Sequence, residues 1–201
     1  MSTGALPRLI RRTAADRPRR RPCDLCGTPL AEDHRHLLDV RDRRPLCACY
    51  ACSVLFQREE AGEGHYRLVP ERRIPVGGLS PARLGVPVGL AFFVERADGE
   101  VVAHYPSPAG ATQWTIDRNA WESAARDCPA LEELRAEVEA LLVNTARGRS
   151  EAWLVPIEDC YRLISVVRRH WTGMFGGDRV WPEIEGFFEE LRRCHGTDTH
   201  R

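Results

Sequence analysis

Two stretches in the middle of the chain predict β-hairpins, because in each of them two apolar runs flank a short polar segment. In "VGLAFFVERADGEVVAHYP" (88–106), runs rich in Val, Phe and Tyr flank Asp98 and Gly99, a pair suited to the positive backbone angles of a tight turn. The stretch "SPAGATQWTI" (107–116) supplies a further strand. A second hairpin runs from "ALLVNT" through "ARGRSE" to "AWLVPI" (140–157). The middle of the chain therefore predicts an antiparallel sheet.

The segments between these strands show the spacing of amphipathic helices. Asp117 is placed to cap a short helix over "RNAWESAARD" (118–127). In "PALEELRAEVEALL" (129–142), apolar residues recur at helical spacing after a proline suited to a helix start. These apolar residues are Leu131, Leu134, Val138, Leu141 and Leu142. The pattern overlaps the second hairpin, so Leu141 either ends a helix or begins a strand.

The C-terminal part predicts two helices joined by a glycine-rich turn. They cover "EDCYRLISVVRRHW" (158–171) and "DRVWPEIEGFFEELRR" (178–193), with "TGMFGG" between them. Proline is tolerated in the first turn of a helix, so the second helix is predicted to begin close to Pro182. Strands followed by helices predict an α+β domain, an antiparallel sheet with helices on one face.

The N-terminal part concentrates cysteine. Two Cys-x-x-Cys pairs, Cys23 with Cys26 and Cys49 with Cys52, are separated by 22 residues. Between them, "RHLLDVRDRRPL" alternates as two short strands around a turn at "RDRR". Two such turns, presented from one small hairpin, supply the four thiolates of a tetrahedral ion with little backbone strain. The spacing predicts a zinc-ribbon or rubredoxin-like module over residues 21–57, with these four cysteines as metal ligands.

A fifth cysteine leaves the ligand set open. In "CACYAC", Cys47 and Cys49 point the same way if the strand stays extended, so Cys47 either replaces Cys49 or lies beside the metal. His34 and His36 are further candidate ligands, or else they cap the surface of the hairpin. Four thiolates serve zinc, mononuclear iron and iron–sulfur clusters alike. Zinc is the expected ion and iron the alternative.

Charge and composition narrow the class of protein. The net charge is zero, but residues 1–20 are rich in arginine and predict a flexible arm. All 29 basic residues are arginine, which excludes a Schiff-base lysine and the lysine of a phosphate-binding loop. The sequence has no apolar run of membrane-spanning length and none typical of a signal peptide. It therefore predicts a cytoplasmic protein, in which clustered cysteines bind metal more often than they form disulfides.

The predicted organisation is an arm (1–20), the metal module (21–57), an α+β domain (66–194) and a flexible tail (195–201). Lone cysteines and histidines in the second domain are expected to be structural. They are Cys128, Cys160, Cys194, His104 and His170. Paired carboxylates, a nucleophile–base pair and an open metal site are not apparent in the sequence, which predicts binding rather than catalysis.

The whole pattern resembles an actinobacterial family of unknown function encoded in operons for uptake nickel-iron hydrogenases. The likeness rests on "CDLCG…HRHLLDV…CACYACSVLF", "PVGLAFFVE", "YPSPAGAT" and "WLVPIEDCYRLISVVRRHW", and it extends over residues 20–193. The resemblance implies an accessory role linked to a hydrogenase and assigns no catalytic residue.

Three functions are compatible with these features. The first is a non-enzymatic adapter whose metal module and α+β domain bind a hydrogenase subunit or a maturation factor. The second is a rubredoxin-like iron electron carrier for a hydrogenase. The third is a nucleic-acid-binding zinc ribbon, which the arginine arm favours. The mixed charge of the module and the lack of aromatic residues among the arginines count against nucleic acid, so a protein partner is expected.

Overall fold

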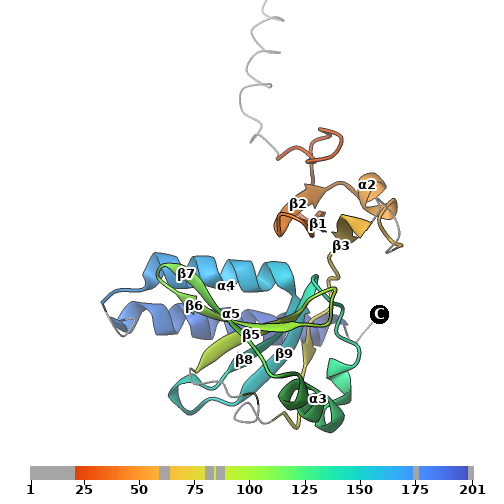
Figure 1. Cartoon of the computed structure of the whole chain (residues 1–201). Helices are drawn as coiled ribbons and strands as arrows, with labels where there is room; N and C mark the ends of the chain where they lie inside the picture. Colours follow the sequence, from red (N-terminus) through yellow and green to blue (C-terminus); the bar gives the residue numbers. More distant parts are fainter. Residues whose placement is uncertain (1–20, 59–63, 80–83, 85–88, 174–176, 199–201) are drawn as a thin grey trace, which may run out of the picture. The chain divides into compact units, whose positions relative to one another are not determined.

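A computed structural model describes residues 21–58, 64–79, 84, 89–173 and 177–198. The chain separates into two compact units, Met1–Leu68 and Val69–Arg201 (Figure 1). The predicted arginine-rich arm, residues 1–20, lies outside the described residues. Each unit has a sheet of its own, and both sheets are antiparallel.

The first unit is built on the hairpin predicted between the cysteine pairs. Strand β1 (Arg35–Asp39) pairs with β2 (Arg44–Ala48), and the chain then enters the short helix α2 (Tyr50–Val54). At the turn, the Asp39 carboxylate accepts a hydrogen bond from the backbone N–H of Arg41 at 3.1 Å. A short polar side chain that bonds the backbone two residues ahead favours a turn, which explains why the hairpin folds here.

A third strand, β3 (Tyr66–Leu68), pairs with the other edge of β1, so the strand order is β2-β1-β3. These residues were predicted at the start of the second domain, whereas the structure has them in the first unit. The reason is apolar burial, because Tyr66 and Leu68 cover a small core. The buried members of this core are Leu37, Leu46 and Ala48.

The second unit contains a six-stranded antiparallel sheet in the order β4-β9-β8-β5-β6-β7. Its strands are β4 (Ile74–Pro75), β5 (Leu90–Glu95), β6 (Val101–Ser107), β7 (Gly110–Thr115), β8 (Glu139–Asn144) and β9 (Glu151–Pro156). Both predicted hairpins, β5–β6 and β8–β9, are present, and β7 is the predicted further strand. In the first hairpin only Gly99 has a positive φ, of 81°, while Asp98 does not.

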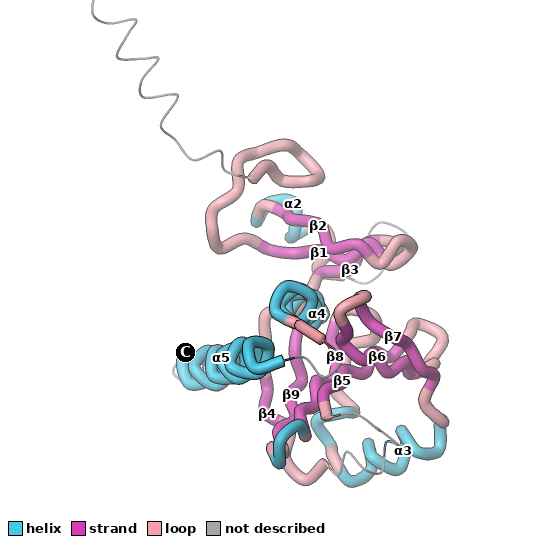
Figure 2. The backbone as a smooth tube through the Cα atoms, turned by 90° about the vertical axis from the view of Figure 1, so that its left-hand side faces the viewer, coloured by secondary structure: helices cyan, strands magenta, loops and turns pink. Residues whose placement is uncertain are grey.

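Helices cover both faces of this sheet (Figure 2). Trp153, on one face, contacts His195 of α5 (Gly177–Asp198), which pairs with α4 (Ile157–His170). Phe93, on the opposite face, contacts Trp121 of α3 (Arg118–Asp127), a helix that Asp117 caps as predicted. The predicted α+β class with an antiparallel sheet and packed helices is therefore confirmed. The helices lie on both faces of the sheet, however, and not on one face as predicted.

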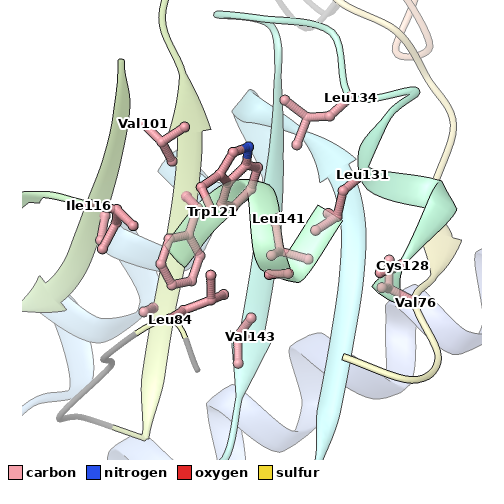
Figure 3. Packing of buried hydrophobic residues seen from close by; sticks show 14 of the residues in the cluster. Val76, Leu84, Val101, Ile116, Trp121, Cys128, Leu131, Leu134, Leu141 and Val143 are labelled. Atoms are coloured by element: carbon pink, nitrogen blue, oxygen red, sulfur yellow. The ribbon is translucent and has the colours of Figure 1, made fainter. Parts of the chain in front are cut away.

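The core beneath α3 is continuous with the centre of the sheet (Figure 3). Its buried side chains come from four strands, from α3, from the 3₁₀ turn Pro129–Leu131 and from the segments that connect these elements. They include Phe93, Val101, Ile116, Trp121, Leu131, Leu134, Leu141 and Leu154. This unit therefore has a hydrophobic core of its own.

The predicted helix over residues 129–142 is wrong. The structure has the 3₁₀ turn, then a change of direction at Glu137 with φ of 67°, then strand β8. All six residues of β8 are buried, because the strand pairs with β5 on one side and β9 on the other. Pairing and burial on both faces outweigh the local helical preference of this segment.

The structure differs from two predictions at the C-terminus. Helix α5 begins at Gly177, one residue before the predicted range of 178–193, but Pro182 is its sixth residue and lies beyond the first turn. Gly177 has a φ of 66°, a value that suits glycine at the start of a new element. The helix also continues to Asp198, so residues 195–198 of the predicted tail are helical. His195 anchors this end through its contacts with Trp153 and the Arg73 carbonyl.

Candidate metal centre

The first unit brings together the sulfur atoms of Cys23, Cys26, Cys49 and Cys52, all within 4.8 Å of one another. The sulfurs of Cys26 and Cys49 are 3.7 Å apart. Four sulfurs arranged tetrahedrally around zinc at about 2.3 Å are separated by about 3.8 Å. The four thiols therefore fit a single ion without a change of backbone, and the cluster can hold a metal.

The first pair lies in a tight turn closed by backbone hydrogen bonds. The N–H of Cys23 donates to the carbonyl of Thr28 at 2.8 Å, and the N–H of Gly27 donates to the carbonyl of Cys23 at 2.9 Å. Gly27 has a φ of 75°, and this conformation is accessible to glycine at little cost. The turn therefore presents both sulfurs in the same direction.

The second pair lies at the start of α2. Cys49 is the N-cap residue of this helix, and the N–H of Ser53 donates to its carbonyl at 2.9 Å. Cys49 and Cys52 are three residues apart on one helical turn, so their side chains lie on the same face. The backbone N–H of Cys49 also donates to the sulfur of Cys23 at 3.3 Å, which joins the two pairs directly.

The thiols have unequal acidities. The sulfur of Cys26 lies 3.3 Å from the Thr28 hydroxyl, and hydrogen bonds from Thr28 to the thiolate lower the pKa of Cys26 to about 6. Hydrogen bonds with Cys26 and then Cys49 raise the pKa of Cys52 to about 12. Burial opposes ionisation of Cys23, but backbone N–H donors outweigh it and lower its pKa. A metal ion binds thiolates, so binding at this cluster displaces the protons of the thiols.

Cys47 lies outside the four-sulfur group. Strand β2 ends at Ala48 and the chain turns into α2, so Cys47 and Cys49 do not lie on one extended strand, which was the condition for their side chains to point the same way. The Cys47 sulfur instead groups with ring nitrogens of His34 and His36. Both histidines were predicted as candidate ligands of the first ion, whereas this separate cluster was not predicted.

Three of the five cysteines and histidines that were expected to be structural are buried in the second unit. Cys128 and Cys160 are buried, and the ring of His104 stacks on Phe92 at 4.7 Å with an interplanar angle of 2°. A pocket of this unit beside α3 has a volume of about 660 Å³ and an acidic lining. Burial raises the pKa of the Glu95 carboxyl there, with a partial offset from Arg118.

Large apolar side chains are exposed around the two cysteine turns. Leu25 lies between Cys23 and Cys26, while Tyr50, Val54 and Leu55 lie in or just after α2. Among the described residues, four of the five large exposed apolar side chains belong to this unit, and Tyr50 is 75% exposed. Trp114 on β7 is the fifth. Exposed apolar groups concentrated on so small a unit are typical of a surface that binds another protein.

The fold and the cysteine cluster define an α+β protein with a small N-terminal module that can hold a metal ion. Residues 22–195 match the model of a family of unknown function, DUF5947, so the chain belongs to that family. No curated protein and no solved structure matches the chain significantly. Within the described ranges, no helix is both long and apolar enough to cross a membrane.

Proposed function

We propose that the protein is a metal-binding, non-enzymatic adapter whose cysteine module binds a protein partner. The observation that carries this proposal is the exposure of Leu25, Tyr50, Val54 and Leu55 around the four-sulfur cluster. A tetrahedral ion held by four thiolates has no position left for a substrate. The ion would then stabilise the surface that carries these apolar side chains.

Zinc is the ion that we propose for this cluster, with Cys23, Cys26, Cys49 and Cys52 as its ligands. The buried core of the first unit is small, with three buried apolar residues in each of its two clusters. So small a core supplies little stability by burial alone, and a structural metal compensates in proteins of this size. Zinc suits that role because it has no redox chemistry and accepts four thiolates.

The partner that we propose is a structural subunit or a maturation factor of a nickel-iron hydrogenase in the cytoplasm. This part of the proposal rests on the resemblance of the sequence to a family encoded in uptake hydrogenase operons. A hydrogenase-linked adapter acts after transcription, at the level of assembly or activity.

The experiment is a gene deletion in the host, followed by complementation. The deletion is expected to lower hydrogen uptake without changing the hydrogenase transcripts. Wild-type protein restores uptake, whereas Tyr50→Ser with Leu55→Ser fails although the chain keeps its metal. Trp114→Ser is the matched control, because it removes an exposed aromatic from the other unit. Wild-type uptake in the deletion strain contradicts the hydrogenase link, and loss of transcript favours a nucleic-acid partner.

A rubredoxin-like electron carrier is the second candidate. It is favoured by the exposed side chain of Cys26, since a ligand at the surface shortens the path for electron transfer to a partner. Iron and zinc are distinguished by colour and by redox titration, because a ferric thiolate site is red and zinc has no redox chemistry. A colourless protein with stoichiometric zinc excludes this candidate.

A further inference from the structure

The hairpin of the first unit carries a second group of ligand atoms, beside the four-sulfur cluster. His36 of β1 is the cross-strand partner of Cys47 in β2, so their side chains lie on the same face. His34 precedes His36 by two residues, and the two rings have centroids 4.7 Å apart. One nitrogen of each ring and the Cys47 sulfur all lie within 4.8 Å of one another.

The ring of His34 is oriented as the ring of a metal ligand. Its Nδ1 lies 3.0 Å from the carbonyl oxygen of Ala31 and 3.1 Å from that of Glu32. Carbonyl oxygens only accept, so Nδ1 carries the proton and Nε2 carries a lone pair. That Nε2 is buried and has no hydrogen-bond partner within the described structure. A ligand histidine shows this arrangement, in which one nitrogen donates to a carbonyl and the other is left for the metal.

Cys47 is held in place by the first cysteine turn. Its backbone N–H donates to the carboxylate of Asp24 at 2.7 Å, and the N–H of Asp24 donates to the carbonyl of Cys47 at 2.9 Å. The Cys47 side chain is 5% exposed. These two hydrogen bonds fix the strand on which the sulfur lies, so a small movement of the side chains suffices to bring all three ligand atoms onto one ion.

We propose that His34, His36 and Cys47 form a second metal site, separate from the four-cysteine site. Two imidazoles and one thiolate suit a divalent ion of borderline softness such as Zn²⁺. Three protein ligands leave the fourth tetrahedral position for water or another small donor, unlike the closed four-thiolate site. This proposal does not depend on the adapter function, because it rests on a different set of ligands.

The test uses the full-length protein and measures bound zinc by elemental analysis. Wild-type protein binds two equivalents per chain, while His34→Gln and Cys47→Ser each bind one. Cys26→Ser, in the other site, also keeps one equivalent. His170→Gln in α4 is the control for loss of a histidine and keeps two. A wild-type stoichiometry of one, or two equivalents in the His34→Gln variant, overturns the proposal.

A second measurement distinguishes the loss of a metal ligand from poor folding of the variant, since poor folding also lowers the metal content. In protein loaded with Co²⁺, imidazole shifts the visible absorption of the site with an open position and leaves the four-thiolate site unchanged. His34→Gln abolishes this response while the spectrum of the four-thiolate site remains. An unchanged imidazole response in His34→Gln contradicts a separate second site. The proposal is also contradicted if His34→Gln and Cys47→Ser each lose the four-thiolate site together with the second site.

Discussion

The sulfur of Cys26 lies 3.7 Å from the sulfur of Cys49, although 23 positions of sequence separate them. The hairpin of β1 and β2 accounts for this contact, because it returns the chain to the first cysteine turn. A hydrogen bond from the Cys49 backbone to the Cys23 sulfur fixes the approach of the two pairs. The backbone of the module therefore holds the four sulfur atoms in positions that fit one metal ion.

Serine replacements test the assignment of ligands in the four-sulfur cluster. Cys26→Ser and Cys52→Ser are each expected to lose the ion of this site, because a lost thiolate leaves a tetrahedral ion unsaturated. Elemental analysis of the purified variants measures the loss of one equivalent per chain. Cys194→Ser on α5 is the control and keeps the wild-type content. Unchanged content in both ligand variants would contradict the assignment.

The four-cysteine cluster was predictable from the sequence because its geometry is local. Each Cys-x-x-Cys turn has its own backbone hydrogen bonds, and the strands between the turns alternate clearly. The cluster of His34, His36 and Cys47 was not predicted, because it depends on the register of the hairpin. Counting outward from the turn pairs His36 with Cys47, so the signal was present in the sequence.

Strand β8 shows why the rest of the fold was harder to predict. Its first residue, Glu139, follows a leucine-rich acidic stretch that has the spacing of a helix. The Glu139 carboxylate is paired with Arg72, which lies 67 positions earlier in the chain. Pairing with two strands and with a distant arginine stabilises the extended conformation. A short stretch of sequence does not show these partners, so the local pattern predicted a helix.

The buried ion pair gives a prediction about stability. Arg72 donates to both oxygens of Glu139, at 2.7 and 2.9 Å, and the Glu139 side chain is fully buried. Arg72→Ala leaves this carboxylate without its countercharge. We expect the free energy of unfolding to fall by about 3 kcal/mol, the lower end for a broken buried pair, because Arg72 itself is partly exposed. Urea denaturation measures the change.

Arg149 provides the matched control, since its 3.2 Å ion pair with Glu185 is exposed on both sides. Arg149→Ala is expected to cost less than about 1 kcal/mol. Equal effects of the two substitutions would show that burial of Glu139 does not determine the strength of its pairing.

The second unit is predicted to fold without the cysteine module. Its core joins the sheet, α3 and the 3₁₀ turn through residues that all follow Val69. A chain that begins at Val69 should melt in one cooperative transition, and its melting temperature should not respond to a metal chelator. Circular dichroism and calorimetry measure both properties. A non-cooperative melt would mean that the first unit completes this core.

Glu95 gives a prediction about pH. Burial raises the pKa of its carboxyl in the folded protein, and Arg118 offsets part of this rise. The folded state therefore favours the neutral form of Glu95. The contribution of this form to the free energy of unfolding is present below the ordinary carboxyl pKa, and it is lost as the pH rises through the pKa of Glu95 in the folded protein. Glu95→Gln should raise the melting temperature at pH 7, with the gain disappearing near pH 4.

The control for this prediction is Glu122→Gln, because Glu122 lines the same cavity but is exposed. That substitution should leave the pH dependence of the melting temperature as in the wild type. A Glu95→Gln variant whose gain is the same at pH 4 and pH 7 would show that ionisation of Glu95 does not matter for stability.

X-ray absorption at the metal edge tests the four-cysteine site most directly. The sample is the full-length chain carrying His34→Gln, so that the second proposed site does not contribute. A four-thiolate site predicts one ion per chain with a first shell of four sulfurs at about 2.3 Å. A metal-free chain, or a first shell that contains nitrogen or oxygen ligands, would contradict the site.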